Sequence, residues 1–121
     1  MIYAILAYHE EGDITALTAE QDDALMDDLM KAHDRINEHA RLGPAARLDF
    51  TGSAATLRRR VVIDGPFAET KEQLLGLYVL ECDSLDAAVE AARELQRVNT
   101  SAVYEIRPIT VYLPGTPVQG A

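Results

Sequence analysis

Histidines are the residues of this 121-residue chain best suited to acid–base chemistry, and there are three. His33 follows Leu29 by four residues and precedes Ile36 by three, so it falls on the apolar stripe of an expected helix. An imidazole there could act as a general base near neutral pH. It could equally be a buried histidine held by one hydrogen bond. His9 ends the first expected strand beside a loop and His39 lies toward the flank of the helix, so both are weaker candidates.

A second candidate site lies in residues 64–72, which read Asp-Gly-Pro-Phe-Ala-Glu-Thr-Lys-Glu. Asp-Gly-Pro predicts a tight turn closing a strand, in which Asp64 would accept a local hydrogen bond. The residues that follow are not required by any turn. Phe67 could plug the loop against the core or form a platform for a substrate, and Glu69 and Lys71 could pair, bind a polar substrate or remain solvated.

Other residue types add little chemistry. Tyr78 could line a cavity, although a tyrosine packed in a strand is the commoner case. The three histidines do not have a compact metal-ligand spacing and the lone Cys82 has no partner, so we expect no metal and no internal disulfide. Glycine-rich phosphate loops and nucleophile elbows are not found in the sequence, and we expect no cofactor.

The elements that would position these residues alternate between strands and helices. Thr18 and Gln21 have the spacing of a capping box at the start of a helix, and Ser84 is a suitable N-cap for a second one. Gly43-Pro44 predicts the end of the first helix at about Leu42. The expected order is a strand over 1–8, a polar loop over 9–17, a helix over 19–42, strands over 47–50, 56–63 and 74–82, a helix after 84, and a strand over 102–113.

This order predicts an α+β fold, a ferredoxin-like antiparallel sheet with two helices on one face. The strands over 1–8 and 74–82 are apolar on both faces, as expected for strands covered on both sides. An uncovered second face would be an unusually large apolar patch for a monomer. We therefore expect a homodimer with the sheets packed against each other.

Composition predicts one domain over residues 1–113 and a loose Pro/Gly-rich tail over 114–121. The net charge of −9 argues against a nucleic-acid surface. The basic cluster Arg58-Arg59-Arg60 could be a solvated edge paired with acids or an anion-binding rim. No apolar run is long enough to span a membrane and no charged leader is present, so the expected location is the cytoplasm.

The motif at 64–72, together with its flanks, resembles the signature of the YCII-related family, often called the DGPF domain. The flanks that match are Thr56-Leu57-Arg58, Gln73-Leu74, Gly76, Tyr78 and the start of the second helix at 84–88. The family is similar to the dimeric α+β barrels, which often hold a small-molecule cavity between helix and sheet. The sequence departs from the family pattern in two places: Leu75 replaces a usual glycine, and the region before the signature, where the family often has a hairpin turn, is shortened.

The resemblance implies a candidate site. Proposed catalytic residues of the family are a histidine and an aspartate, which correspond here to His33 and Asp64. One relative is linked to dehydrochlorination of a hydroxylated aromatic, so the expected activity is cofactor-independent proton transfer or elimination on a small metabolite. Lys71 or an arginine would stabilise negative charge. The alternative is a non-enzymatic domain that binds a ligand or a regulatory partner, since relatives occur beside sigma-factor-like regulators. A third interpretation makes the signature wholly structural.

Overall fold

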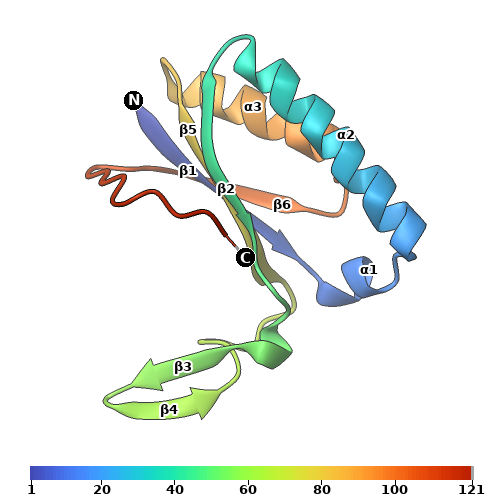
Figure 1. Cartoon of the computed structure of the whole chain (residues 1–121), viewed down its shortest axis with the longest axis vertical. Coiled ribbons are helices and arrows are strands. Elements are labelled where there is room, and N and C mark those ends of the chain that lie inside the picture. Colours follow the sequence, from blue (N-terminus) through green and yellow to red (C-terminus); the bar gives the residue numbers. More distant parts are fainter. Residues whose placement is uncertain (121) are drawn as a thin grey trace.

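The computed structural model describes residues 1–120 and shows a sheet with helices on one face (Figure 1). The elements in chain order are β1 (Ile2–His9), α1 (Glu11–Thr15), α2 (Ala19–Asn37), β2 (Arg41–Arg47), the short 3-10 helix η1 (Thr51–Ser53), β3 (Ala55–Arg58), β4 (Val61–Asp64), β5 (Gln73–Glu81), α3 (Leu85–Val98) and β6 (Val103–Pro108).

The main sheet has the strand order β2-β5-β1-β6, and every neighbouring pair is antiparallel. The long helices α2 and α3 cover the same face of this sheet (Figure 1). This arrangement confirms the predicted α+β ferredoxin-like fold. A separate two-stranded sheet, β3-β4, is inserted between the two strands β2 and β5.

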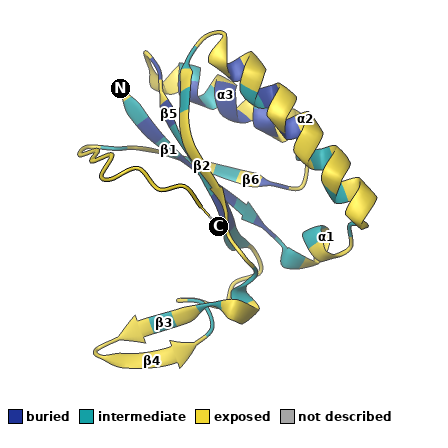
Figure 2. Ribbon diagram, viewed as in Figure 1, coloured by how far each residue is buried: buried dark blue, intermediate teal, exposed yellow. Residues whose placement is uncertain are grey.

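Alternation along β1 separates the two faces of the sheet. Tyr3, Ile5, Ala7 and His9 are buried toward the helices, while the residues between them are only half-buried on the opposite face (Figure 2). The core under the helices is completed by residues such as Leu80 from β5 and by Leu29, Ala32, Ile36, Ala88, Ala91, Ala92 and Leu95 from α2 and α3. Apolar burial against the sheet is the main term that holds both helices in place.

The predicted helix starts are confirmed. The Thr18 hydroxyl accepts a hydrogen bond from the Gln21 backbone N–H at 3.1 Å, and the Gln21 side chain accepts one from the Thr18 N–H at 3.0 Å. Ser84 likewise caps α3 by accepting from the Ala87 N–H. These contacts satisfy backbone donors that have no partner inside the helix.

The predicted end of the first helix is wrong. α2 ends at Asn37, and the residues up to Arg47 form the edge strand β2. Asn37 accepts the backbone N–H of Leu42 at 2.9 Å and so links the helix end to the strand. Gly43-Pro44 lies within β2, where the register shifts between Leu42 and Ala45, because an edge strand tolerates the missing N–H of proline.

Three other boundaries also differ. Residues 56–63 are not one strand but the hairpin β3-β4, and the two turn residues Arg59 and Arg60 have φ of 49° and 72°. The hairpin turn that seemed shortened in the sequence is therefore present. The loop expected over 9–17 contains the short helix α1, and the expected strand over 47–50 retains only Arg47 as a strand residue. The last strand ends at Pro108 instead of residue 113.

Figure 1 shows the hairpin projecting from the body of the molecule, below the sheet in this view. We call residues 55–64 the arm. Within the described residues 1–120, no helix is both long and apolar enough to cross a bilayer.

Candidate functional site

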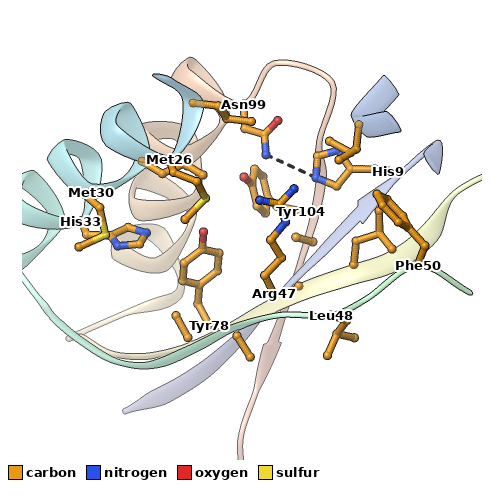
Figure 3. Close-up of a pocket in the computed structure, with 18 residues that line it drawn as sticks. His9, Met26, Met30, His33, Arg47, Leu48, Phe50, Tyr78, Asn99 and Tyr104 are labelled. Atoms are coloured by element: carbon orange, nitrogen blue, oxygen red, sulfur yellow. Dashed lines mark hydrogen bonds between the residues drawn. The ribbon is translucent and has the colours of Figure 1, made fainter. Parts of the chain in front are cut away.

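A cavity of about 380 Å³ lies between α2 and the end of the sheet where β1 finishes (Figure 3). Its wall is mostly apolar. The apolar and small lining residues are Ala7, Ile14, Leu25, Met26, Leu29, Met30, Ala45, Ala46, Leu48, Phe50, Leu75 and Gly76, and the polar ones are His9, His33, Arg47, Tyr78, Asn99 and Tyr104. An apolar pocket with a few convergent polar groups is the usual form of a small-molecule site.

Backbone geometry explains why this space stays open. Gly76 on β5 lies opposite Ala7 on β1, and a Cβ at position 76 would come within 3.2 Å of the Ala46 carbonyl oxygen. Because the glycine and the alanine at these paired positions have little or no side chain, the sheet leaves space for the cavity above them. Leu75, which sits at the bulge between the Ala7 and Tyr8 pairings, is buried and fills part of the wall.

His33 reaches the cavity from α2. Its ring meets the ring of Tyr78 edge to face, with centroids 5.4 Å apart and an interplanar angle of 79°. Its Nε2 atom is buried and has no hydrogen-bond partner among residues 1–120. Burial lowers the pKa of His33 below its ordinary value, and the nearby carboxylate of Asp34 only partly opposes this. The imidazole is therefore neutral near pH 7.

His9 is the second imidazole of the cavity and is only 4% exposed. Asn99 Nδ2 lies 3.4 Å from His9 Nε2, as the dashed line in Figure 3 marks. An amide donor against Nε2 leaves the ring proton on Nδ1. That Nδ1 atom is buried and lacks a partner in the described part of the chain. Burial, with the charge of Arg47, lowers the pKa of His9, and Asp13 raises it less.

Two tyrosines and an ion pair complete the polar groups. Burial and the neighbouring Tyr78 raise the pKa of the Tyr104 hydroxyl, which therefore stays protonated. Arg47 on β2 donates to both carboxylate oxygens of Asp22 on α2, at 3.1 and 3.3 Å. This half-exposed pair connects α2 to the edge strand beside the cavity.

The structure separates the residues that the sequence analysis had grouped. His33 and Tyr78 lie together in the cavity, whereas Asp64 is an exposed residue of β4 that pairs with Ala55 in the arm. His33 and Asp64 do not meet within the chain.

The remaining signature residues also lie outside this cavity. Phe67 borders a second, more open groove of about 560 Å³ near the base of the arm, and Arg58 lies 5.3 Å from its ring. Glu69 is exposed, and Lys71 forms an exposed ion pair with Glu10 at 3.1 Å.

The sequence analysis missed three polar residues of the cavity, which are Arg47, Asn99 and Tyr104, and it ranked His9 only as a weaker candidate. A signal for His9 was available, because strict alternation from Tyr3 places it on the buried face of β1. Asn99 has no such signal, since it lies at the C-cap of α3 outside any periodic pattern.

Comparison with known proteins confirms the family resemblance of the sequence. A family model described as YCII-related domain matches residues 1–112. The chain is also 48% identical over 120 residues to the "Uncharacterized protein R00369" of Rhizobium meliloti (strain 1021), and the match covers 95% of this chain and 97% of that protein. On these matches, the chain belongs to the YCII-related domain family.

Proposed function

We propose that the cavity binds a small, largely apolar metabolite and that His33 acts on it as a general base. The observation that carries this proposal is the pair of imidazoles that line the cavity, His9 and His33, each with a buried ring nitrogen that has no partner among residues 1–120. A buried polar atom without a partner costs about 1–3 kcal/mol. Both rings border one cavity, so a ligand that enters it and draws these nitrogens toward itself would satisfy them.

The chemistry we propose is cofactor-independent proton transfer or elimination. The neutral ring of His33 accepts a proton at Nε2 and becomes an imidazolium. The electron pair left on the substrate either stays there as an anion or expels an anionic leaving group. His9 Nδ1–H and the hydroxyls of Tyr78 and Tyr104 supply donors for that developing charge.

A non-enzymatic ligand-binding role is the second candidate, and one observation favours it. Within the described residues, no carboxylate is hydrogen-bonded to His33, and Asp64 is in the arm. A base without an orienting partner has less control over its tautomer and direction. Binding alone needs only the shape and the donors of the cavity.

The two candidates are distinguished by hydrogen–deuterium exchange. The protein is incubated in D2O with a panel of small phenols and carbonyl compounds, and NMR follows both binding and the loss of carbon-bound protons. We expect His33→Gln to abolish exchange and the matched variant His39→Gln, on an exposed histidine, to retain it. Binding without any exchange would support the ligand-binding role, and exchange unaffected by His33→Gln would refute the assignment of the base.

We also propose that the chain forms a homodimer through the outer face of the main sheet. Support comes from apolar side chains on that face, such as Leu6 on β1 and Leu77 and Val79 on β5, which are only half-buried in the single chain. A face of this kind is usually covered. Sedimentation velocity of Leu6→Asp against the parent chain tests this, because a charge in the interface should yield monomers.

A further inference from the structure

The arm is a two-stranded sheet that pairs with no other strand of the described chain. Isolated hairpins are at best marginally stable in water. This one also has arginines at both left-handed turn positions, where asparagine and glycine are preferred. The arm is therefore the element of this structure with the least internal support.

Large apolar side chains are exposed on both faces of the arm. Leu57 and Val62 pair across one face and are 70% and 68% exposed. Val61 and Ile63 are exposed on the other face, and Phe67, just beyond the arm, is 78% exposed. Such a concentration of exposed apolar side chains within one ten-residue element indicates a surface that is covered by another molecule.

The family signature holds this element in position. Gly65 has φ of 105°, a value that disfavours any side chain, and its N–H donates to the Ala54 carbonyl at 2.8 Å. The Thr56 hydroxyl donates to the Gly65 carbonyl at 2.9 Å. Asp64-Gly65-Pro66 thus closes the base of the arm and directs the chain back toward β5.

The distribution of charge indicates which molecule covers the arm. Three of the 11 Lys and Arg residues of the chain are consecutive at the tip of the arm, Arg58-Arg59-Arg60, in a chain with 20 Asp and Glu and a net charge of −9. Among residues 1–120 none of these arginines forms an ion pair, although Arg58 lies over the ring of Phe67. A strongly acidic protein with a basic, apolar projection is complementary to a second copy of itself.

On these observations we propose that the arm grips the second copy of this chain, with the apolar faces of β3 and β4 packed against the partner and the arginine tip meeting its acidic surface. The signature is then the structural base of a dimer clamp instead of a catalytic loop. The inference rests on the proposed homodimer and adds to it a specific element that the sheet face does not contain.

Three double variants of the arm test the clamp in the full chain, with the dimer dissociation constant measured by sedimentation velocity over a concentration series. Leu57→Ser/Val62→Ser removes apolar surface, and we expect the dissociation constant to rise at least about tenfold. Arg59→Asn/Arg60→Gly removes two charges while relaxing the turn, and Arg59→Lys/Arg60→Lys keeps the charge.

The outcomes separate the clamp from the dimer itself. The Asn-Gly variant should weaken association, most clearly at low salt, and the Lys-Lys variant should not. Leu85→Ser, at an exposed apolar residue of α3, is the control that should leave association unchanged. If the Leu57→Ser/Val62→Ser and Arg59→Asn/Arg60→Gly variants both dimerise with the dissociation constant of the parent chain, the clamp is wrong and the sheet interface stands. A parent chain that is monomeric at all concentrations would overturn both.

Discussion

Replacing His9 by leucine should stabilise the protein while it destroys the site. His9 is almost fully buried, and its Nδ1–H has no acceptor within residues 1–120. Leucine occupies a similar space and needs no partner. If His9 is retained for a ligand, the folded chain carries its unsatisfied donor as a cost, because groups kept for function are often unfavourable for stability.

The expected magnitude follows from two opposing terms. Removing the unsatisfied donor should raise the free energy of unfolding by about 1–3 kcal/mol. Losing the contact between His9 and Asn99 should lower it by about 0.5–1.5 kcal/mol. Asn99 is only partly buried, so water can satisfy its amide after the change. The net effect is a gain of about 1 kcal/mol, equivalent to about 3–6 °C in Tm for a chain of this size.

The effect of His9→Leu on stability should also depend on pH. Burial lowers the folded-state pKa of His9 below 6.5, so the unfolded chain binds the proton more readily. The parent chain therefore loses stability as pH falls below 6.5, and the leucine variant is spared this contribution. The difference in free energy of unfolding between His9→Leu and the parent chain should therefore grow on acidification, with a pH dependence of at most one proton.

Urea unfolding at pH 7.5 and pH 5.5 measures both effects, with His39→Leu, at an exposed histidine, as the control. A loss of about 2 kcal/mol or more in His9→Leu at pH 7.5 would refute the reasoning. It would show that the imidazole makes a structural hydrogen bond and is not reserved for a ligand.

Other substitutions test the remaining geometry. Because His33 and Asp64 do not contact each other, the unfolding free-energy losses of His33→Ala and Asp64→Ala should add to within about 0.5 kcal/mol in the double variant, and a larger coupling would show that they meet. Leu75→Ala should enlarge the cavity and cost about 2–5 kcal/mol by urea unfolding, since Leu75 is buried in its wall; a neutral result would mean the wall collapses. Asp22→Asn should lower the free energy of unfolding by less than about 1 kcal/mol. Because it releases Arg47, it should also raise the affinity of the cavity for carboxylates, which calorimetry with benzoate measures. An unchanged affinity would exclude Arg47 from binding.

Local chemistry made parts of the fold predictable. The reciprocal bonds of Thr18 and Gln21 need only four consecutive residues, and the cap at Ser84 needs as few. The boundaries that failed depend on pairing over long distances. Gly43-Pro44 has the composition of a helix end, but its place in β2 is decided by the pairing with β5, some 35 residues later in the chain. Arg59-Arg60 lacks the Asn-Gly chemistry that marks a two-residue turn.

The candidate site likewise combines features that nearby residues predict with features that depend on long-range packing. Helical spacing predicted that His33 faces the core, and β-strand alternation could have predicted the same for His9. Neither period indicates that the two rings border one cavity, since that depends on Gly76 lying beside Ala7 and on the space that α2 leaves above the sheet.

The signature was the strongest motif of the sequence, and the structure places it away from the cavity. Asp64 and Gly65 close the base of the arm, and Phe67 lies beside Arg58. A distinctive motif is thus compatible with a structural role, because a left-handed glycine, a fixed proline and a chain reversal restrict residue type as strongly as catalysis does. His9, by contrast, occupies a buried position where we expect leucine to be more stable. Substitutions in the signature turn and the substitution His9→Leu should therefore change the free energy of unfolding in opposite directions, with loss of stability at the turn and gain at His9.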